Sequence, residues 1–119
     1  GIEALTDRAS GRMIGWAGLA VPHFLPEILP AVEVGWRLSG PSRGKGFATE
    51  AGRAALEYGF TDGGLDCIVS LYEPENAASG RVMERLGFTH RLSTDGPRGE
   101  EVAVMELPRD RWEARRVHR

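Results

Sequence analysis

The sequence lacks the features that predict a disulfide framework, a membrane-spanning segment or a metal centre. It has one cysteine, Cys67, so no internal disulfide can form, and we expect a cytoplasmic protein. No apolar run approaches the roughly 20 residues that a membrane-spanning helix needs, so we expect no membrane partner. The three histidines are scattered, and no spacing of histidine and cysteine predicts a metal site.

A strong charge of one sign is also lacking. The formal net charge is −2, which gives no basis for general nucleic-acid binding, and we expect no nucleic-acid partner. The content of hydrophobic residues (41%) and charged residues (27%) is ordinary for a globular protein, and 119 residues suffice for one core. We therefore predict one domain over residues 1–108 and an arginine-rich tail over residues 109–119. The tail is interpreted as a solvated helix or frayed end that Trp112 pins to the body, with a segment for an anionic partner as the alternative.

Hydrophobic periodicity switches between strand and helix spacing, which predicts an α/β (α+β) fold. Strands are expected over residues 2–7, 13–21, 31–39, 67–71, 88–92 and 101–107, and helices over residues 47–60 and 76–86. Three prolines in residues 22–30 predict a loop. Because a helix connects them, the strands over 31–39 and 67–71 are expected to be parallel, whereas the last two form an antiparallel pair.

The stretch from Ser42 to Glu50 is rich in glycine and lies between a predicted strand and a predicted helix. The start of a helix leaves backbone N–H groups without partners, which makes it a ready site for a phosphate. Gly44 and Gly46 would let a ligand approach the backbone closely, and Arg43 and Lys45 add positive charge. The stretch therefore predicts a phosphate or pyrophosphate site.

Two familiar phosphate motifs do not fit this stretch. The ATP- and GTP-binding loop needs four residues between its first glycine and its Gly-Lys pair. Here only three residues separate Gly40 from the pair Gly44-Lys45. The dinucleotide fingerprint needs a glycine or alanine where Thr49 stands. The pattern R/Q-x-x-G-x-G/A does fit, at Arg43, Gly46 and Ala48. It resembles the acetyl-CoA pyrophosphate loop of the GNAT superfamily of N-acetyltransferases.

The resemblance extends along residues 2–108. After the glycine-rich stretch come a helix, a strand, the sequence P-E-N-A-A-S at residues 74–79, a second helix, and L-G-F at residues 86–88. This order of elements and motifs is similar to that of the GNAT branch that contains the ribosomal-protein N-terminal acetyltransferases. It implies a mixed, mostly antiparallel twisted sheet with helices on both faces.

Family members usually begin with a strand and two helices that form one wall of the acceptor cleft, and this sequence opens after them. The chain is then a short or truncated version, or another chain completes the cleft. The first strand would be an exposed edge, which favours pairing with a second copy in a homodimer.

The resemblance implies direct transfer of an acetyl group from acetyl-CoA to a primary amine, on a protein N-terminus or a small molecule. Glu33 would act as the base, with Glu73 as a weaker candidate, and the hydroxyl of Ser79 or Tyr72 would stabilise the departing thiolate. Arg81 or Arg85 could meet the adenosine 3′-phosphate. The remaining contacts with the cofactor would come from Trp36, Leu38, Arg43, Gly44, Lys45, Gly46, Phe47, Ala48, Asn76 and Ser79.

Each of these side chains also has a plainer interpretation. Asn76 can be a helix N-cap, Ser79 a first-turn residue, Glu33 a surface carboxylate, and Arg81 and Arg85 exposed helix charges. The alternative function, from another class, is a catalytically inactive CoA-binding module with a regulatory or assembly role. A general nucleotide-binding protein is disfavoured because both nucleotide motifs fail.

Overall fold

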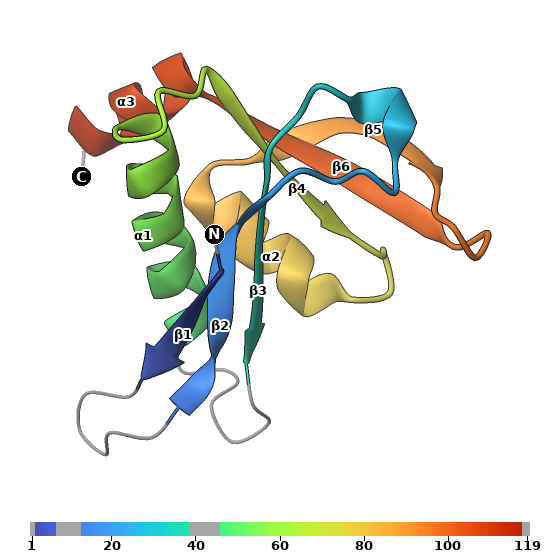
Figure 1. Ribbon diagram of the computed structural model, residues 1–119, viewed down its shortest axis with the longest axis horizontal. Helices are drawn as coiled ribbons and strands as arrows, with labels where there is room; N and C mark the ends of the chain where they lie inside the picture. The colour runs from blue at the N-terminus through green and yellow to red at the C-terminus, as the bar shows by residue number, and fades with distance from the viewer. Residues whose placement is uncertain (1, 7–12, 39–45, 118–119) are drawn as a thin grey trace.

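The computed structural model describes residues 2–6, 13–38 and 46–117. This part of the chain forms a mixed α/β fold around one sheet (Figure 1). The elements are, in order, β1 (Ile2–Thr6), β2 (Met13–Ala20), the 3-10 helix η1 (Pro26–Ile28), β3 (Glu33–Leu38), α1 (Phe47–Phe60), β4 (Cys67–Tyr72), α2 (Ala77–Leu86), β5 (Thr89–Asp95), β6 (Glu101–Pro108) and α3 (Arg109–Val117). The predicted strands and the two predicted helices are all found, with ends that move by a few residues.

The sheet has six strands in the order β1-β2-β3-β4-β6-β5. Every neighbouring pair is antiparallel except β3 and β4, which run parallel because α1 carries the chain across between them. The predicted mixed, mostly antiparallel sheet is thus confirmed. β1 lies at one edge of the sheet, as expected, and dimerisation through it stays a prediction.

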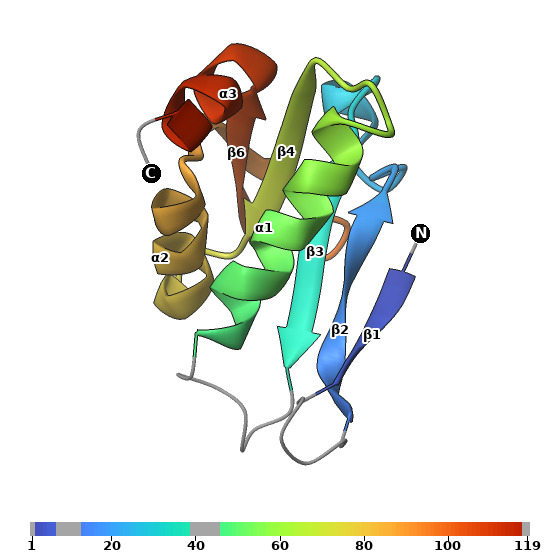
Figure 2. The same cartoon turned by 90° about the vertical axis from the view of Figure 1, so that its left-hand side faces the viewer.

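All three α-helices cover the same face of the sheet (Figure 2). Their apolar sides form the main core, in which Phe60 and Trp112 are 1% and 5% exposed. The side chains that face them from β3, β4 and β6 alternate along each of these strands, as the pleat requires. The buried residues of this core are Val34, Leu56, Phe60, Ile68, Met83, Leu86, Phe88, Met105, Leu107 and Trp112.

The opposite face is covered by the segment between β2 and β3 and by no α-helix of the described chain. Leu25 and Ile28 of this segment are buried against Val69, Val102 and Val104 of the sheet. The expectation of helices on both faces is therefore corrected: here the second face carries only the single turn of η1. The prolines that predicted a loop are compatible with this turn, because one of them, Pro26, opens it.

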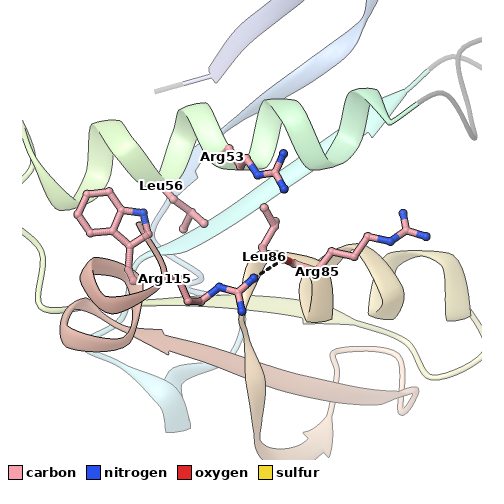
Figure 3. Close-up of a pocket in the computed structure, with 6 residues that line it drawn as sticks. Arg53, Leu56, Arg85, Leu86 and Arg115 are labelled. Atoms are coloured by element: carbon pink, nitrogen blue, oxygen red, sulfur yellow. Dashed lines mark hydrogen bonds between the residues drawn. The ribbon is translucent and has the colours of Figure 1, made fainter. Parts of the chain in front are cut away.

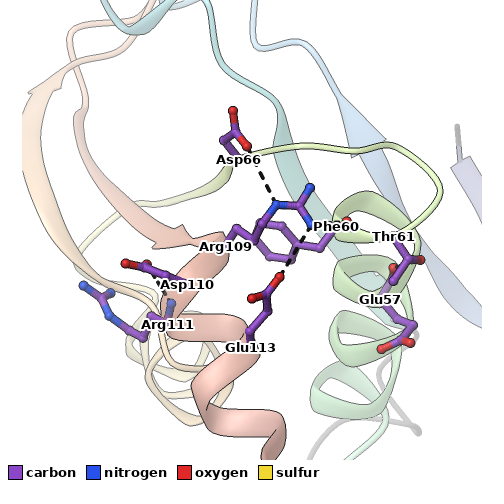
Figure 4. A network of polar contacts seen from close by, with 8 residues as sticks. All are labelled: Glu57, Phe60, Thr61, Asp66, Arg109, Asp110, Arg111 and Glu113. Atoms are coloured by element: carbon purple, nitrogen blue, oxygen red, sulfur yellow. Dashed lines mark hydrogen bonds and ion pairs between the residues drawn. The ribbon is translucent and has the colours of Figure 1, made fainter.

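The arginine-rich C-terminal segment is a helix, α3, fixed to the body by its one buried side chain. The ring of Trp112 stacks on Phe60 of α1, with 4.8 Å between the ring centroids. Beside it, Arg109 donates to the carbonyl oxygen of Phe60 at 2.6 Å and pairs with Asp66 and Glu113 at 3.7 and 3.8 Å (Figure 4). The predicted anchoring by Trp112 is confirmed. Within the described ranges, none of the helices combines the length and the apolar character that crossing a bilayer demands.

Candidate functional site

The start of α1 carries backbone donors that the helix itself does not use. Gly46 precedes the helix in the left-handed conformation, with φ of 78°, which glycine adopts without strain. The N–H of Glu50 donates to the carbonyl oxygen of Gly46 at 3.1 Å. This is the first i to i−4 bond of the helix, so the N–H groups of residues 47–49 precede the hydrogen-bonded ladder. The predicted residues Arg43, Gly44 and Lys45 lie outside the described part of the chain.

These donors border a cavity of about 210 Å³ between α1 and α2. Arg81 and Arg85 of α2 bring two positive charges to its far side. Pockets that enclose a whole small ligand measure roughly 300–1,000 Å³, so this cavity suits one part of a larger ligand. The structure thus brings three predicted residues, Gly46, Phe47 and Ala48, together with the two arginines.

Thr49 also lines this cavity, and the sequence did not indicate its role. Its side chain is buried, with the residue 8% exposed, and its Oγ1 has no hydrogen-bond partner in the described chain. A buried hydroxyl without a partner destabilises the folded state by about 1–3 kcal/mol. A ligand oxygen in the cavity would remove that penalty. The available sequence signal was a hydroxyl residue in the first turn of a helix that follows a glycine-rich stretch.

The strands β3 and β4 meet at one residue pair, Glu33 with Val69, and then separate. The N–H of Val69 donates to the carbonyl oxygen of Val32 at 2.9 Å. One residue further along β4, the buried hydroxyl of Ser70 donates to the carbonyl oxygen of Val34 at 2.9 Å. A side chain thus takes the place of a main-chain partner where the strands diverge (Figure 1). In the sequence Ser70 is only a polar interruption of the apolar run at residues 67–71.

The diverging ends of the two strands carry the predicted residues Trp36, Leu38 and Tyr72. Trp36 and Tyr72 pack against the main core, on the face covered by the helices, and Leu38 ends β3. The ring of Tyr72 lies directly on α2, where a Cβ at position 80 would be 3.0 Å from its Cε2 atom. The absence of a side chain at Gly80 therefore allows this close approach, and the Tyr72 ring lies beside the first turns of α2.

Asn76 caps α2, as predicted. Its Oδ1 accepts from the N–H of Ser79 at 3.3 Å, which leaves its amide N–H₂ group available to a ligand. Ser79 lies in the first turn of the helix. Asn76, Ser79 and Tyr72 are thus gathered at the end of β4 and the start of α2.

Glu33 lies apart from this group. It belongs to the face of β3 opposite Val34, which points into the main core, and it pairs in register with Val69. Tyr72 is three residues beyond Val69, or about 10 Å along the strand. Burial raises the pKa of Glu33, as suits a base that must work near neutral pH. A role for Glu33 is therefore compatible with action from the other side of the sheet or through water.

The other side chains considered from sequence are engaged elsewhere. Glu73 lies 3.7 Å from Arg98 in an ion pair, which occupies its carboxylate. Burial raises the pKa of the Cys67 thiol, so this cysteine is not activated as a nucleophile. Within the described residues, no group of three or more metal-binding side chains is assembled.

Residues 1–89 match the family model described as the acetyltransferase (GNAT) domain. The chain belongs to the GNAT family. Every candidate residue named above lies within the matched region. The curated relative YkkB of Bacillus subtilis, an uncharacterised protein, is 34% identical over 100 residues, which cover 84% of this chain and 56% of YkkB.

Solved GNAT structures share the fold. A GNAT-family acetyltransferase from Bordetella pertussis is 30% identical with a TM-score of 0.78, over 89% of this chain and 64% of that one. The aminoglycoside acetyltransferase AAC(6′)-Ib, solved in complex with coenzyme A, is 24% identical with a TM-score of 0.78, over 90% of this chain and 66% of that one. The chain therefore spans little more than half of YkkB and under two thirds of the Bordetella protein. The narrower resemblance to the ribosomal-protein branch stays a prediction.

Proposed function

We propose that this chain forms the acetyl-CoA-binding part of an N-acetyltransferase that acts on a primary amine. One observation carries the proposal. The residues whose N–H groups precede the hydrogen-bonded ladder of α1, among them Thr49 with its buried hydroxyl, line the same cavity as Arg81 and Arg85 of α2. Hydrogen-bond donors and cations around one space suit a diphosphate.

In this proposal the start of α1 binds the pyrophosphate of the cofactor. The N–H groups of Phe47, Ala48 and Thr49 donate to its oxygens, and the helix dipole adds a partial positive charge. Arg43, Gly44 and Lys45, which precede the helix in the sequence, would contribute further contacts with the pyrophosphate. Gly46 takes the left-handed conformation directly before the first turn of the helix.

The diverging strands β3 and β4 would then receive the extended arm of the cofactor. Where Ser70 replaces the main-chain partner of Val34, the edge of β3 beyond it is open to an added strand-like segment. Trp36 and Leu38 line this edge, and the free amide N–H₂ of Asn76 donates to a carbonyl of the arm. The reacting end would reach the region of Tyr72 and Ser79.

A bound acetyl-CoA would supply the thioester: the acceptor nitrogen would add to the acetyl carbon, and the carbon–sulfur bond would then break and release the thiolate of CoA. Glu33 accepts the proton that the acceptor ammonium must lose, directly or through water. A main-chain N–H of β3 near Trp36 donates to the carbonyl oxygen as negative charge grows on it. The hydroxyl of Ser79 or Tyr72 donates to the departing sulfur.

The acceptor is proposed to be a primary amine on a protein N-terminus or on a small molecule. Aminoglycosides, after which one structural neighbour is named, carry such amines.

Calorimetric titration with CoA tests the binding step. We expect saturable binding by the wild type and none by Gly46→Glu, because a side chain at φ of 78° is strained and a carboxylate repels the phosphates. Gly64→Glu is the matched control, since Gly64 also has positive φ, of 61°, but lies beyond the far end of α1. Binding by Gly46→Glu that equals the control would refute the assignment of the loop.

A second assay separates an enzyme from an inactive CoA-binding module. Acetyl-CoA is mixed with the protein and a panel of peptides and small amines, and the release of free thiol is followed. Thiol release that depends on one class of amine supports the transferase. CoA binding without thiol release over the whole panel supports the inactive module instead.

A further inference from the structure

A second, smaller cavity lies between α1, α2 and α3, and three arginines are among the residues that line it (Figure 3). Its volume is about 80 Å³. Arg53, Arg85 and Arg115 each come from a different helix, and the apolar lining consists of Leu56, Leu86 and Trp112. Nothing in the proposed transfer reaction requires Arg53 or Arg115.

Arg115 is held in position by two contacts with the end of α2. Its Nη2 donates to the carbonyl oxygen of Arg85 at 2.7 Å. Its side chain also lies against Gly87, where an added Cβ would be 2.6 Å from the Cδ atom. A guanidinium has five N–H donors, so one hydrogen bond leaves most of them for another partner. The position of this cation is thus fixed before any ligand arrives.

The three arginines of this cavity lack carboxylate partners in the described part of the chain. Arg91, Arg98, Arg109 and Arg116, by contrast, each form an ion pair there. Glu57 of α1 is not available to the cavity arginines, because Arg116 binds it at 3.2 Å. Arg116 also lies 4.5 Å from the centre of the Trp112 ring, which closes this side with another cation. Arg53, Arg85 and Arg115 therefore bring positive charge to the cavity, and no carboxylate of the described residues forms an ion pair with them.

We propose that this cavity is a second anion site, which binds a phosphate monoester. A phosphate dianion offers several oxygens to guanidinium groups that approach from different directions. The apolar floor of Leu56, Leu86 and Trp112 strengthens these interactions by excluding water from one side. The volume admits a compact group and is well below the roughly 300–1,000 Å³ that encloses a nucleotide-sized ligand.

The site is distinct from the candidate pyrophosphate cavity but shares one residue with it. Arg85 lines both cavities, and its side chain extends along α2 away from Arg115 (Figure 3). The phosphate can therefore come from two sources: a separate phosphorylated molecule, or the 3′-phosphate of a CoA that lies in the first cavity. Only the second source depends on the proposed function.

Side-chain NMR gives a local test. The Nε–Hε signals of the arginines are recorded while inorganic phosphate is added at constant ionic strength, with sodium chloride as the matched titration. We expect the signals of Arg53 and Arg115 to shift saturably and with one dissociation constant. The signal of Arg98, which is held by Glu73 and Glu100, should stay in place. The amide signal of Gly46 reports separately on the pyrophosphate loop.

Two single variants make the result specific. In Arg53→Gln the apparent dissociation constant for phosphate, measured from the shift of the Arg115 signal, should rise at least tenfold. In Arg115→Gln the dissociation constant measured from the Arg53 signal should rise by at least the same factor. Arg98→Gln is the control and should change neither. Shifts that do not saturate, that sodium chloride reproduces, or that survive both variants would overturn the proposal.

A comparison of CoA with 3′-dephospho-CoA identifies the source. If CoA moves the signals of Arg53 and Arg115 and 3′-dephospho-CoA does not, the phosphate belongs to the cofactor. If inorganic phosphate moves them and neither cofactor does, the site serves a separate phosphorylated molecule. In that case a shift of the Gly46 amide signal with CoA still supports the proposed function. If CoA leaves the Gly46 signal in place, the proposed function is contradicted, while the proposal of a second phosphate site stands.

Discussion

Replacing Thr49 by valine should stabilise the protein and weaken its binding of CoA. Valine has nearly the shape of threonine, so the packing between α1 and α2 is preserved while the buried, unpaired Oγ1 is removed. An unsatisfied buried polar group destabilises by about 1–3 kcal/mol. Thr49 lies at the margin of a cavity, so we take the lower end, about 1 kcal/mol. For a domain of this size, that raises the melting temperature by about 3–5 °C.

The loss of affinity follows from the same hydroxyl. A hydrogen bond to a charged group contributes about 1.5–3 kcal/mol, which corresponds to a weakening of CoA binding by about 10- to 150-fold. Thermal unfolding without ligand measures the first effect, and calorimetric titration with CoA measures the second. We thus expect thermal stability to rise and affinity for CoA to fall in the same variant. A general loss of structure would lower both.

Two further variants serve as controls. Thr49→Ser keeps the hydroxyl and should retain most of the affinity for CoA. Thr61→Val removes a hydroxyl that already donates to the carbonyl oxygen of Glu57, so it should not stabilise the protein. A Thr49→Val protein that melts below the wild type, or that binds CoA with unchanged affinity, would refute the reasoning.

Three other predictions concern the body of the fold and the candidate base. Trp112→Ala should lower the free energy of unfolding by about 3–5 kcal/mol in a urea titration, because it removes a buried ring that stacks on Phe60. Ser70→Ala should lower it by about 1–3 kcal/mol, because the buried carbonyl of Val34 loses its donor. Glu33→Gln should raise it at pH 8, because burial raises the pKa of Glu33 and its ionisation therefore opposes folding at higher pH. This gain should vanish as the pH falls below about 4, where the carboxyl is protonated in both the folded and the unfolded states.

Specific outcomes would contradict these three expectations. A Trp112→Ala protein with unchanged stability would mean that α3 does not support the core. A neutral Ser70→Ala change would show that another donor reaches Val34. A Glu33→Gln protein whose stability relative to the wild type does not change with pH would mean that the carboxylate is solvated in the folded state.

Local signals in the sequence predicted most of the elements. The helix over residues 47–60 has the predicted ends, because Gly46 precedes it and the turn from Thr61 to Gly64 stops it. Asn76 was recognised as an N-cap by its residue type and position. The parallel pairing of β3 and β4 followed from the helix between them. Each of these predictions depends on residues that are close together in the chain.

The features that the sequence did not predict depend on residues far apart in the chain. Ser70 bonds to Val34 across 36 positions, and Arg115 bonds to Arg85 across 30. The lack of a partner for the Thr49 hydroxyl is visible only when α1 and α2 are packed together. The second face of the sheet is covered by the segment between β2 and β3, whose apolar residues Leu25 and Ile28 lie among prolines and show no regular period.

The single residue pair between β3 and β4 also divides the sheet into two units of three strands, each continuous along the chain. Residues up to Phe60 supply β1, β2, η1, β3 and α1, and residues from Cys67 onward supply β4, α2, β5, β6 and α3. Between the units, main-chain pairing is minimal, and side-chain packing of the helices supplies most of the cohesion. A break in the connection at residues 61–66 would therefore leave two complementary fragments, whose reassembly in solution should depend on hydrophobic contact far more than on strand pairing.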